Sequence, residues 1–396
     1  MFCELRPYYC RKSSHEFQNF FMIEDLSKYQ VPKTFQSFVV PPEKTGEVIK
    51  LLRKCDKLAN YPGFRNVRED PNGRRILLAE GVKDISEIPD EVKNIVGSIE
   101  LSPFDTFLDY HNYTLQDLMK LFLPEGCVIP SSFETIGHIA RLNLLPEQQD
   151  YKKLIGQAIL LKNPVIKTVV SKIGTINNVY RSMELDVLAG DPNFETEVKQ
   201  SGFHFKLDFS KVYWNSRLEG EHDALVSTFN ENAIVADAMC GIGPFAVRAA
   251  KKKNCKVYAN DLNPDSYKWL QVNAELNHVA DKIICSNLDA REFIVKIFEN
   301  GGCDYIIMNL PKIAVEFLDA VAEGAQKYKE TARMPICIFH TFDGKDEDHE
   351  ASILARAVKA LGMPLARLNV HKVRDVSPGK DMFRCSFDVR DLFNDE

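Results

Sequence analysis

The sequence predicts an α/β protein with a doubly wound, mostly parallel sheet in residues 206–396, preceded by smaller α+β domains. From Ala233 onward, apolar strands and amphipathic helices alternate along the chain. The first two units are IVADAMCGIGPFAVRAAKKK and KVYANDLNPDSYKWLQVNAELN, and each reads as strand, turn and helix. Because parallel strands are joined by helical crossovers, this order places helices on both faces of one sheet.

The same alternation continues toward the C-terminus. Apolar runs predict further strands at Lys282–Cys285, Tyr305–Met308, Pro335–Phe339 and Leu368–Arg374. Helical patterns predict helices at Ile313–Lys329 and His349–Leu361. These elements complete the predicted sheet.

The residues before the sheet domain predict a tail (1–30), an accessory α/β domain (31–125) and a middle domain (126–205). The accessory domain has strand-like runs and a polar helix, at Phe35–Val40, Arg75–Ala79 and Lys44–Cys55. The middle domain has apolar–polar alternation, a helical pattern and a strand pattern, at Phe133–Leu144, Tyr151–Leu161 and Val165–Val170. Alternation in Phe203–Trp214 predicts a hairpin that leads into the sheet domain.

The composition is that of a soluble globular protein. Of the 396 residues, 45% are hydrophobic and 27% are charged. No uncharged apolar run reaches the roughly 18 residues of a membrane helix, so membrane-spanning and disordered classes are excluded. The net charge of −6 argues against a strongly basic nucleic-acid binder but allows a local basic patch. The ten cysteines include no CxxC pair, which indicates buried thiols in a reducing compartment and no zinc site.

The N-terminal tail carries a weak targeting signal. Arg6, Arg11 and Lys12 followed by two serines are typical of a mitochondrial transit segment, whereas Glu4 and Glu16 are not. The alternative is a loosely packed tail.

A glycine-rich turn after the first strand of the sheet domain predicts a ligand site. Asp237, Gly241 and Gly243 form D-x-x-x-G-x-G at the start of a helix. The amide groups and positive dipole end of that helix favour an anionic or carboxylate group. A dinucleotide fingerprint requires a third glycine where Ala246 stands, so nicotinamide cofactors are the weaker choice. The pattern instead resembles the S-adenosylmethionine turn of Rossmann-like methyltransferases.

The next two strand ends support a nucleoside ligand. Asp261 lies at the tip of the second strand, where a carboxylate accepts both ribose hydroxyls. Asn287 and Asp289 follow the third strand, placed to meet an adenine edge. Each residue alone has an ordinary structural alternative, such as a helix N-cap. Three successive strand ends with suitable groups favour the cofactor.

The fourth strand ends in Asn309, Leu310 and Pro311, at the edge of the sheet where open α/β folds place chemistry. The amide of Asn309 both donates and accepts, so it can hold a heterocycle edge, while Pro311 fixes the turn. The motif looks like that of methyltransferases acting on amino groups of planar bases. The alternative is an ordinary turn after a strand.

From about Ser131 to Phe387, the chain resembles the eukaryotic and archaeal tRNA (guanine-37-N1)-methyltransferases. The segments that carry the resemblance are SSFETIGHIARLNL, LIGQAILLKNPVIKTVVSKIGTINNVYR, LDFSKVYWNSRL, GIGPFAVRAAKK, ANDLNPDSYKWL, NLDAREFI, MNLP and VRDVSPGKDMFRCSF. The resemblance implies a Rossmann-like class I methyltransferase domain that uses S-adenosylmethionine. It also implies a tRNA partner with guanosine at position 37, methylated at N1.

Residue roles follow from this resemblance. The family's catalytic arginine falls on Arg181, its general base on Glu221 and its Asn-Leu-Pro turn on Asn309–Pro311. Guanine N1 becomes nucleophilic as its proton leaves, which suits a carboxylate base, and the charge that develops on O6 suits a fixed guanidinium. Asn309 and Pro311 would hold the flipped-out base in line with the methyl group. The predicted cofactor contacts are His222, Asp237, Gly241, Gly243, Pro244, Asp261, Leu262, Asn287, Asp289 and Asn309.

A basic strip in Tyr151–Met183 predicts an RNA contact, because the segment has no acidic residue. Its basic residues are Lys152, Lys153, Lys162, Lys167, Lys172 and Arg181. Arg374, Lys380 and Arg384 near the C-terminus are expected to add to it. The alternative is a solvated helix face.

Four positions depart from the family pattern. Lys312 replaces a small residue, Cys240 replaces an alanine, Asp223 follows His222 where serine is commoner, and Arg141 stands where a histidine is frequent. None removes a proposed catalytic group. Lys312 and Asp223 are expected to change the charge near the base and the target pocket.

Three other functions compete with methyl transfer to guanosine. The aminocarboxypropyl transferases of wybutosine synthesis share the fold and cofactor but lack the Asn-Leu-Pro turn and the base carboxylate. A non-catalytic tRNA-binding protein would be expected to have lost Asp261, Glu221 or Asn309. A small-molecule or protein methyltransferase leaves the basic strip without a purpose. We therefore expect a monomeric enzyme that needs no metal and no membrane, in cytoplasm, nucleus and mitochondrial matrix.

Overall fold

The computed structural model describes residues 30–130, 132–173, 184–344 and 348–393. The chain divides into two compact units. The first comprises residues 1–133, 143–169 and 188–190, and the second comprises residues 134–142, 170–187 and 191–396.

The first unit contains an antiparallel sheet with the strand order β2-β3-β1-β4. Helices α1 and α2 pack on it through a core that includes Phe38, Leu52 and Ile76. The strands are β1 (Gln30–Val40), β2 (Val67–Asp70), β3 (Gly73–Leu77) and β4 (Ser102–Asp109). The helices of the unit are α1 (Thr45–Lys54), α2 (Asp90–Val96), α3 (Leu115–Phe122) and α4 (Lys152–Lys162).

A second small sheet has the order β5-β6-β7-β8, and the boundary between the two units falls within β7 and β8. Its strands are β5 (Glu134–Ile136), β6 (Ile139–Leu142), β7 (Thr168–Lys172) and β8 (Leu185–Gly190). The hairpin predicted within 203–214 is wrong, because only residues 203–208 form a strand and its partner precedes it in the chain. Strand β10 (Phe203–Asp208) pairs with the preceding strand β9 (Glu195–Gln200), because Ser201 and Gly202 both adopt positive φ and form the turn.

The second unit is built on a seven-stranded sheet with the order β13-β12-β11-β14-β15-β17-β16. The first five strands in this order are parallel, and β17 pairs antiparallel with both β15 and β16. The strands are β11 (Ile234–Asp237), β12 (Lys256–Asn260), β13 (Ile283–Ser286), β14 (Tyr305–Met308), β15 (Ile336–Gly344), β16 (Asn369–Ser377) and β17 (Lys380–Asp388). The sheet confirms the predicted Rossmann-like, mostly parallel class.

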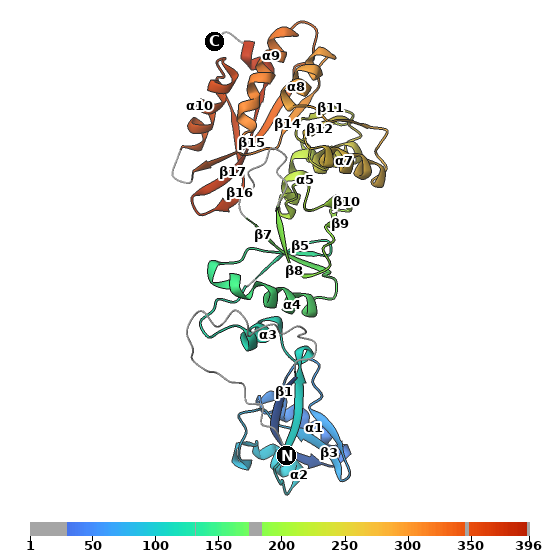
Figure 1. Cartoon of the computed structure of the whole chain (residues 1–396), viewed down its shortest axis with the longest axis vertical. Helices are drawn as coiled ribbons and strands as arrows, with labels where there is room; N and C mark the ends of the chain where they lie inside the picture. The colour runs from blue at the N-terminus through green and yellow to red at the C-terminus, as the bar shows by residue number, and fades with distance from the viewer. Residues whose placement is uncertain (1–29, 131, 174–183, 345–347, 394–396) are drawn as a thin grey trace. The chain divides into compact units, whose positions relative to one another are not determined.

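Helices cover both faces of this sheet (Figure 1). Alternate strand residues enter different cores: Val235 packs in a core with α5, α6 and α7, while Ala236 packs in a core with α8, α9 and α10. The helices are α5 (Glu219–Ser227), α6 (Pro244–Lys252), α7 (Pro264–Leu276), α8 (Ala290–Glu299), α9 (Leu318–Lys327) and α10 (His349–Leu361).

Two details of this unit differ from the sequence prediction. The helix predicted at Ile313–Lys329 is divided into a 3-10 segment, Ala314–Phe317, and α9. Strand β17 was not predicted, although Phe383, Cys385 and Phe387 alternate toward the core. Its place between β15 and β16 brings C-terminal residues beside the central strands, which matters for the site.

Candidate cofactor and catalytic site

The turn after β11 has the backbone that its glycines predict. Gly241 and Gly243 have φ values of +56° and +93°, a region that favours glycine. A Cβ on Gly243 would also lie 2.6 Å from Leu270 Cδ1, whereas one on Gly241 would meet nothing within 4 Å. Gly243 is the N-cap of α6, and Pro244 occupies the first turn. The turn therefore leaves open space beside Gly241.

Asp261 fastens this turn to the end of β12. Its Oδ2 accepts from the Gly241 amide at 2.8 Å, and its Oδ1 accepts from the Asn263 amide at 2.9 Å. The Asn287 side-chain amide donates to the backbone oxygens of Asp261 and Leu262, at 2.7 and 3.0 Å. Asn287 thus supports the loop that bears Asp261, and the side chain of Leu262 is left exposed.

Asp237 is a fully buried carboxyl group at the end of β11. Among the described residues, neither of its oxygens makes a well-formed hydrogen bond, although the Met239 amide lies near enough to favour the carboxylate. Burial raises the pKa of Asp237 to about 8, the nearby Asp261 adds to the increase, and the Met239 amide opposes it. A buried acid without partners is costly, so the geometry suits a ligand group that donates hydrogen bonds or carries positive charge.

The polar side chains that follow β13 and β14 have different surroundings. Asp289 caps α8 by accepting from the Arg291 amide at 2.8 Å, as the structural alternative describes. Asn309 follows β14, and its side-chain oxygen is buried without a partner in the described part of the chain. An amide with an unused acceptor fits a group that recognises a ligand edge.

Two basic side chains hold the Glu221 carboxylate, which is 7% exposed on α5. His340 Nε2 lies 2.8 Å from Oε1, and Arg384 Nη1 lies 3.1 Å from both oxygens. Oε1 therefore has two partners and Oε2 has one. This leaves a lone pair of Oε2 available to accept a proton.

Strand register explains why these residues meet. His340 on β15 is the cross-strand partner of Arg384 on β17, so both side chains lie on one face of the sheet. Met308 on β14 is opposite Phe339, which places Asn309 and His340 at neighbouring positions beyond them. A carboxylate can only accept hydrogen bonds, so the contact with Glu221 favours a proton on His340 Nε2. His340 would then donate to Glu221.

His222 follows Glu221 and packs edge-on against Phe245 of α6, with ring centroids 4.7 Å apart. Burial lowers the pKa of His222 to about 3, and Arg248 and His340 add to the decrease. The imidazole is therefore neutral at physiological pH. It lies between α5 and α6, against the start of the helix that follows the cofactor turn.

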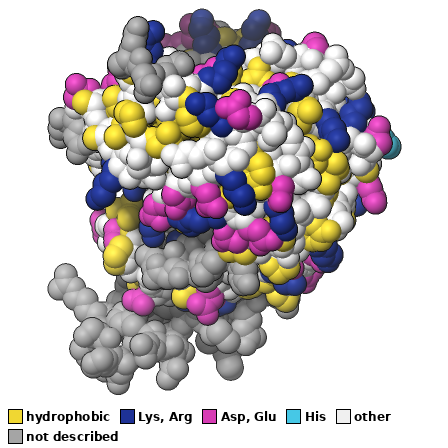
Figure 2. All heavy atoms as spheres, turned by 90° about the horizontal axis from the view of Figure 1, so that it is seen from above, with side chains coloured by type: hydrophobic (Ala, Val, Ile, Leu, Met, Phe, Trp, Pro, Cys, Tyr) yellow, Lys and Arg dark blue, Asp and Glu magenta, His cyan; other side chains and the backbone are white. Residues whose placement is uncertain are grey.

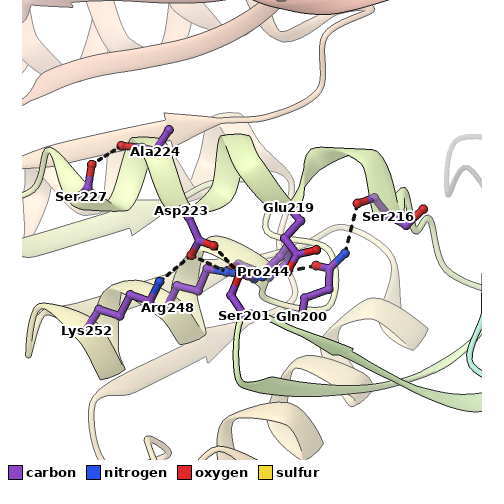
Figure 3. A network of polar contacts seen from close by, with 10 residues as sticks. All are labelled: Gln200, Ser201, Ser216, Glu219, Asp223, Ala224, Ser227, Pro244, Arg248 and Lys252. Atoms are coloured by element: carbon purple, nitrogen blue, oxygen red, sulfur yellow. Dashed lines mark hydrogen bonds and ion pairs between the residues drawn. The ribbon is translucent and has the colours of Figure 1, made fainter.

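A polar network ties α5 to α6 (Figure 3). The fully buried Arg248 donates to Asp223 Oδ1 at 3.2 Å, to the Pro244 carbonyl at 2.9 Å and to Gln200 Oε1 at 3.3 Å. Lys252 Nζ donates to the same Asp223 oxygen at 2.6 Å. The negative charge of Asp223 is thus matched within this network, which fixes the helix carrying Glu221 against the helix that begins at the cofactor turn.

The relatives of this chain decide among the functions. A curated relative from Trichomonas vaginalis, named tRNA (guanine(37)-N(1))-methyltransferase, is 60% identical over 372 residues, covering 94% of this chain and 97% of the relative. The chain belongs to the tRNA (guanine(37)-N(1))-methyltransferase family. The TRM5/TYW2 methyltransferase domain matches residues 196–343, and the TYW2 N-terminal domain matches residues 115–193. The matched domain is shared by TRM5 and TYW2 proteins, so the domain match alone does not distinguish between them. The name of the 60% identical relative does.

Solved structures support the fold of this methyltransferase family. Trm5b from Pyrococcus abyssi is 26% identical with a TM-score of 0.57, covering 89% of this chain and 99% of that chain. The structure described as the complex of aTrm5 and tRNALeu is 21% identical with a TM-score of 0.63, covering 90% and 99%.

Some predicted RNA-contacting residues have other partners or lie outside the described residues. Arg181 is among those outside. Lys162 and Lys167 donate to the backbone carbonyls of Tyr110 and Pro164, at 3.3 and 3.1 Å. Arg384, expected to extend the basic strip, pairs with Glu221 instead. On the face shown in Figure 2, basic side chains lie among acidic ones and form no single positive patch.

The other departures from the family pattern have local explanations. The Cys240 thiol is buried, which raises its pKa well above the usual value. Arg141 pairs with Glu134 at 3.1 Å, and Glu134 also accepts from Ser216 ahead of α5. Lys312 is exposed after the Asn-Leu-Pro turn.

Sequence reasoning missed His340 and Arg248. His340 directly follows the predicted strand Pro335–Phe339 and lies level with the carboxyl end of β14, and that position was an available signal. For Arg248 no local signal exists, since two of its partners, Asp223 and Gln200, come from other segments of the chain. In the described part of the chain, no group of three His, Cys, Asp or Glu side chains has a metal-binding arrangement. No helix there is long and apolar enough to cross a membrane.

Proposed function

We infer that this protein transfers the methyl group of S-adenosylmethionine to N1 of guanosine 37 in tRNA. The named activity of the relative that is 60% identical over nearly the whole chain supports the reaction. The observation in this molecule that carries it is the buried Glu221 carboxylate, held by His340 and Arg384 so that Oε2 has one partner and Oε1 has two.

The groups at the cofactor turn fit S-adenosylmethionine. Asp237 offers a buried acid for the cofactor's ammonium group, Asp261 offers carboxylate lone pairs to the ribose, and the exposed Leu262 offers an apolar surface to adenine. Gly241 leaves room for close approach of the ligand to the backbone. The cofactor supplies an electrophilic methyl group on a sulfonium sulfur.

The protein's own groups would prepare the base for attack. Glu221 Oε2 takes the proton of guanine N1, while the hydrogen bond from His340 keeps Oε1 in place. Asn309 and Pro311 hold the base edge at the end of β14. Arg181 would stabilise the charge that develops on O6.

The aminocarboxypropyl transferases are the second candidate, because they share the fold and cofactor. The test uses purified full-length protein with methyl-labelled S-adenosylmethionine and two unmodified tRNA transcripts, carrying guanosine or adenosine at position 37. Label in 1-methylguanosine on the first transcript alone supports the proposal. Cofactor binding without methyl transfer contradicts it, and transfer of label placed on the cofactor's amino-acid chain would identify the second candidate.

The finer proposals are a monomer that works without metal or membrane, in the cytoplasm, the nucleus and the mitochondrial matrix. Light scattering of the purified protein and activity after treatment with a chelator test the first two. Imaging the full chain with and without residues 1–30 tests the location.

A further inference from the structure

We propose that a cavity beside the Asn-Leu-Pro turn binds a backbone phosphate of the RNA next to the target nucleotide. The inference rests on the proposed function, because it requires an RNA whose target base is held at Asn309–Pro311. The cavity has a volume of about 380 Å³. Its walls come from that turn, the end of β15, helix α10 and the turn between β16 and β17.

The cavity carries unbalanced positive charge. Lys312, Lys380 and Arg356 line it together with one carboxylate, Asp343. Asp343 is already engaged, since its Oδ1 accepts from Arg356 Nη2 at 3.0 Å and from Ser352 Oγ at 3.1 Å. Among the described residues, neither lysine forms an ion pair with a carboxylate. Among the described lining residues, two positive charges therefore remain for a ligand.

Both lysines are placed to act together. Lys312 directly follows Pro311 and lines the cavity, so its side chain starts from the turn that would hold the target base. Lys380 lies on the hairpin side, and its Nζ is 4.5 Å from the centroid of the Phe342 ring, which restrains it at the cavity wall. Gly379 beside it has a φ of +78°, and an added Cβ there would meet nothing within 4 Å. The hairpin turn thus leaves space for a ligand.

A phosphate diester fits this chemistry better than a base. Ammonium groups bind phosphate as point charges, whereas bases are read by paired donors and acceptors or by stacking. Extruding a nucleotide turns it about its own backbone, so its two flanking phosphates stay close to the extruded base. Contacts to those phosphates would fix the position of the nucleotide without reading sequence.

The test measures binding of the full-length protein to an unmodified transcript with guanosine 37, over a range of salt concentrations. The variants are Lys312→Ala and Lys380→Ala. The matched control is Lys359→Ala, an exposed lysine on α10 that does not line the cavity. We expect each cavity variant to weaken binding about three- to tenfold and to lower the salt slope by about 0.7–1, with the control near wild type. Cofactor affinity should be unchanged in all three, which excludes misfolding.

A neutral methylphosphonate at either phosphate flanking nucleotide 37 locates the contact. On the transcript that lacks the bound charge, Lys312→Ala should cause no further loss. The proposal would be overturned if Lys312→Ala weakened binding to both methylphosphonate transcripts as much as to the unmodified one. It would also be overturned if the cavity variants bound tRNA like Lys359→Ala. Inorganic phosphate alone is the second arm. Suppose that inorganic phosphate raises the melting temperature of the wild type but not that of Lys312→Ala, and that the substitution leaves tRNA binding unchanged. The cavity then binds a free anion, and the assignment to RNA fails.

These binding assays separate the two claims. Unchanged salt slopes with normal formation of 1-methylguanosine contradict the cavity proposal alone. The expected slopes without methyl transfer contradict the proposed function alone.

Discussion

Arg384 Nη1 lies 3.1 Å from each carboxylate oxygen of Glu221, although 163 positions separate the two residues in the chain. The contact exists because β17 is inserted between β15 and β16, which sets Arg384 beside His340. Both side chains therefore hold the proposed base from the same face of the sheet.

Replacing Arg384 by leucine should slow methyl transfer without weakening tRNA binding. The substitution frees the carboxylate to leave its position, and misplacement by about 1 Å is enough to cost on the order of 100-fold in rate. Single-turnover rates at saturating cofactor measure the effect, and filter binding measures tRNA affinity. Arg384→Lys, which keeps the charge, should recover part of the rate. If the variant transferred methyl groups at the wild-type rate, or lost only tRNA affinity, Arg384 would instead be assigned to RNA binding.

Asp237→Asn should stabilise the ligand-free protein at high pH and weaken binding of S-adenosylmethionine. The pKa of Asp237 is raised from 3.8 to about 8 in the folded protein. Between these values the folded state binds more protons than the unfolded state, so the carboxyl's contribution to stability is lost as pH rises through 8. Asparagine removes this loss because it does not ionise.

Thermal unfolding from pH 5 to about pH 9 tests this prediction. The melting temperature of the variant should rise relative to wild type as pH increases. Parallel curves for the two proteins would show that Asp237 does not titrate as its burial indicates. Isothermal titration with the cofactor provides the binding comparison.

Arg248→Leu should destabilise the protein by about 3 kcal/mol, because it removes a buried cation that joins its own helix to Asp223 on α5 and Gln200 on β9. Lys252→Ala is the control within the same network. Lys252 is 41% exposed, so its loss should cost less than about 1 kcal/mol. Urea unfolding of both variants measures the difference. Equal costs would mean that the buried guanidinium is not what joins α5 to α6.

Local patterns in the sequence predicted most of the sheet domain. Strand Tyr305–Met308 and helix His349–Leu361 have the predicted bounds, since each is bordered by clear turn or capping residues. The glycines of the cofactor turn were equally readable, because their positive φ restricts the residue type.

Relationships that depend on strand register were not predictable in this way. From the sequence, Arg384 is one of several basic residues near the C-terminus. Nothing near it in the sequence indicates a contact with Glu221. Asp223 likewise reads as a charge close to the base, whereas the structure directs it to Arg248 and Lys252. The hydrogen bonds from the Asn287 side-chain amide to the Asp261 loop were also not predictable, because the neighbouring strands β12 and β13 bring the two together.

The most direct test of the account is the rate at which Glu221→Gln forms 1-methylguanosine on a guanosine-37 transcript, compared with wild type across neutral pH. Glutamine keeps the shape of the side chain and one acceptor oxygen for His340 and Arg384, but it cannot take the N1 proton. We predict a loss of about 100-fold or more, with tRNA and cofactor affinities retained. A rate equal to that of wild type would contradict the assignment of Glu221 as the general base.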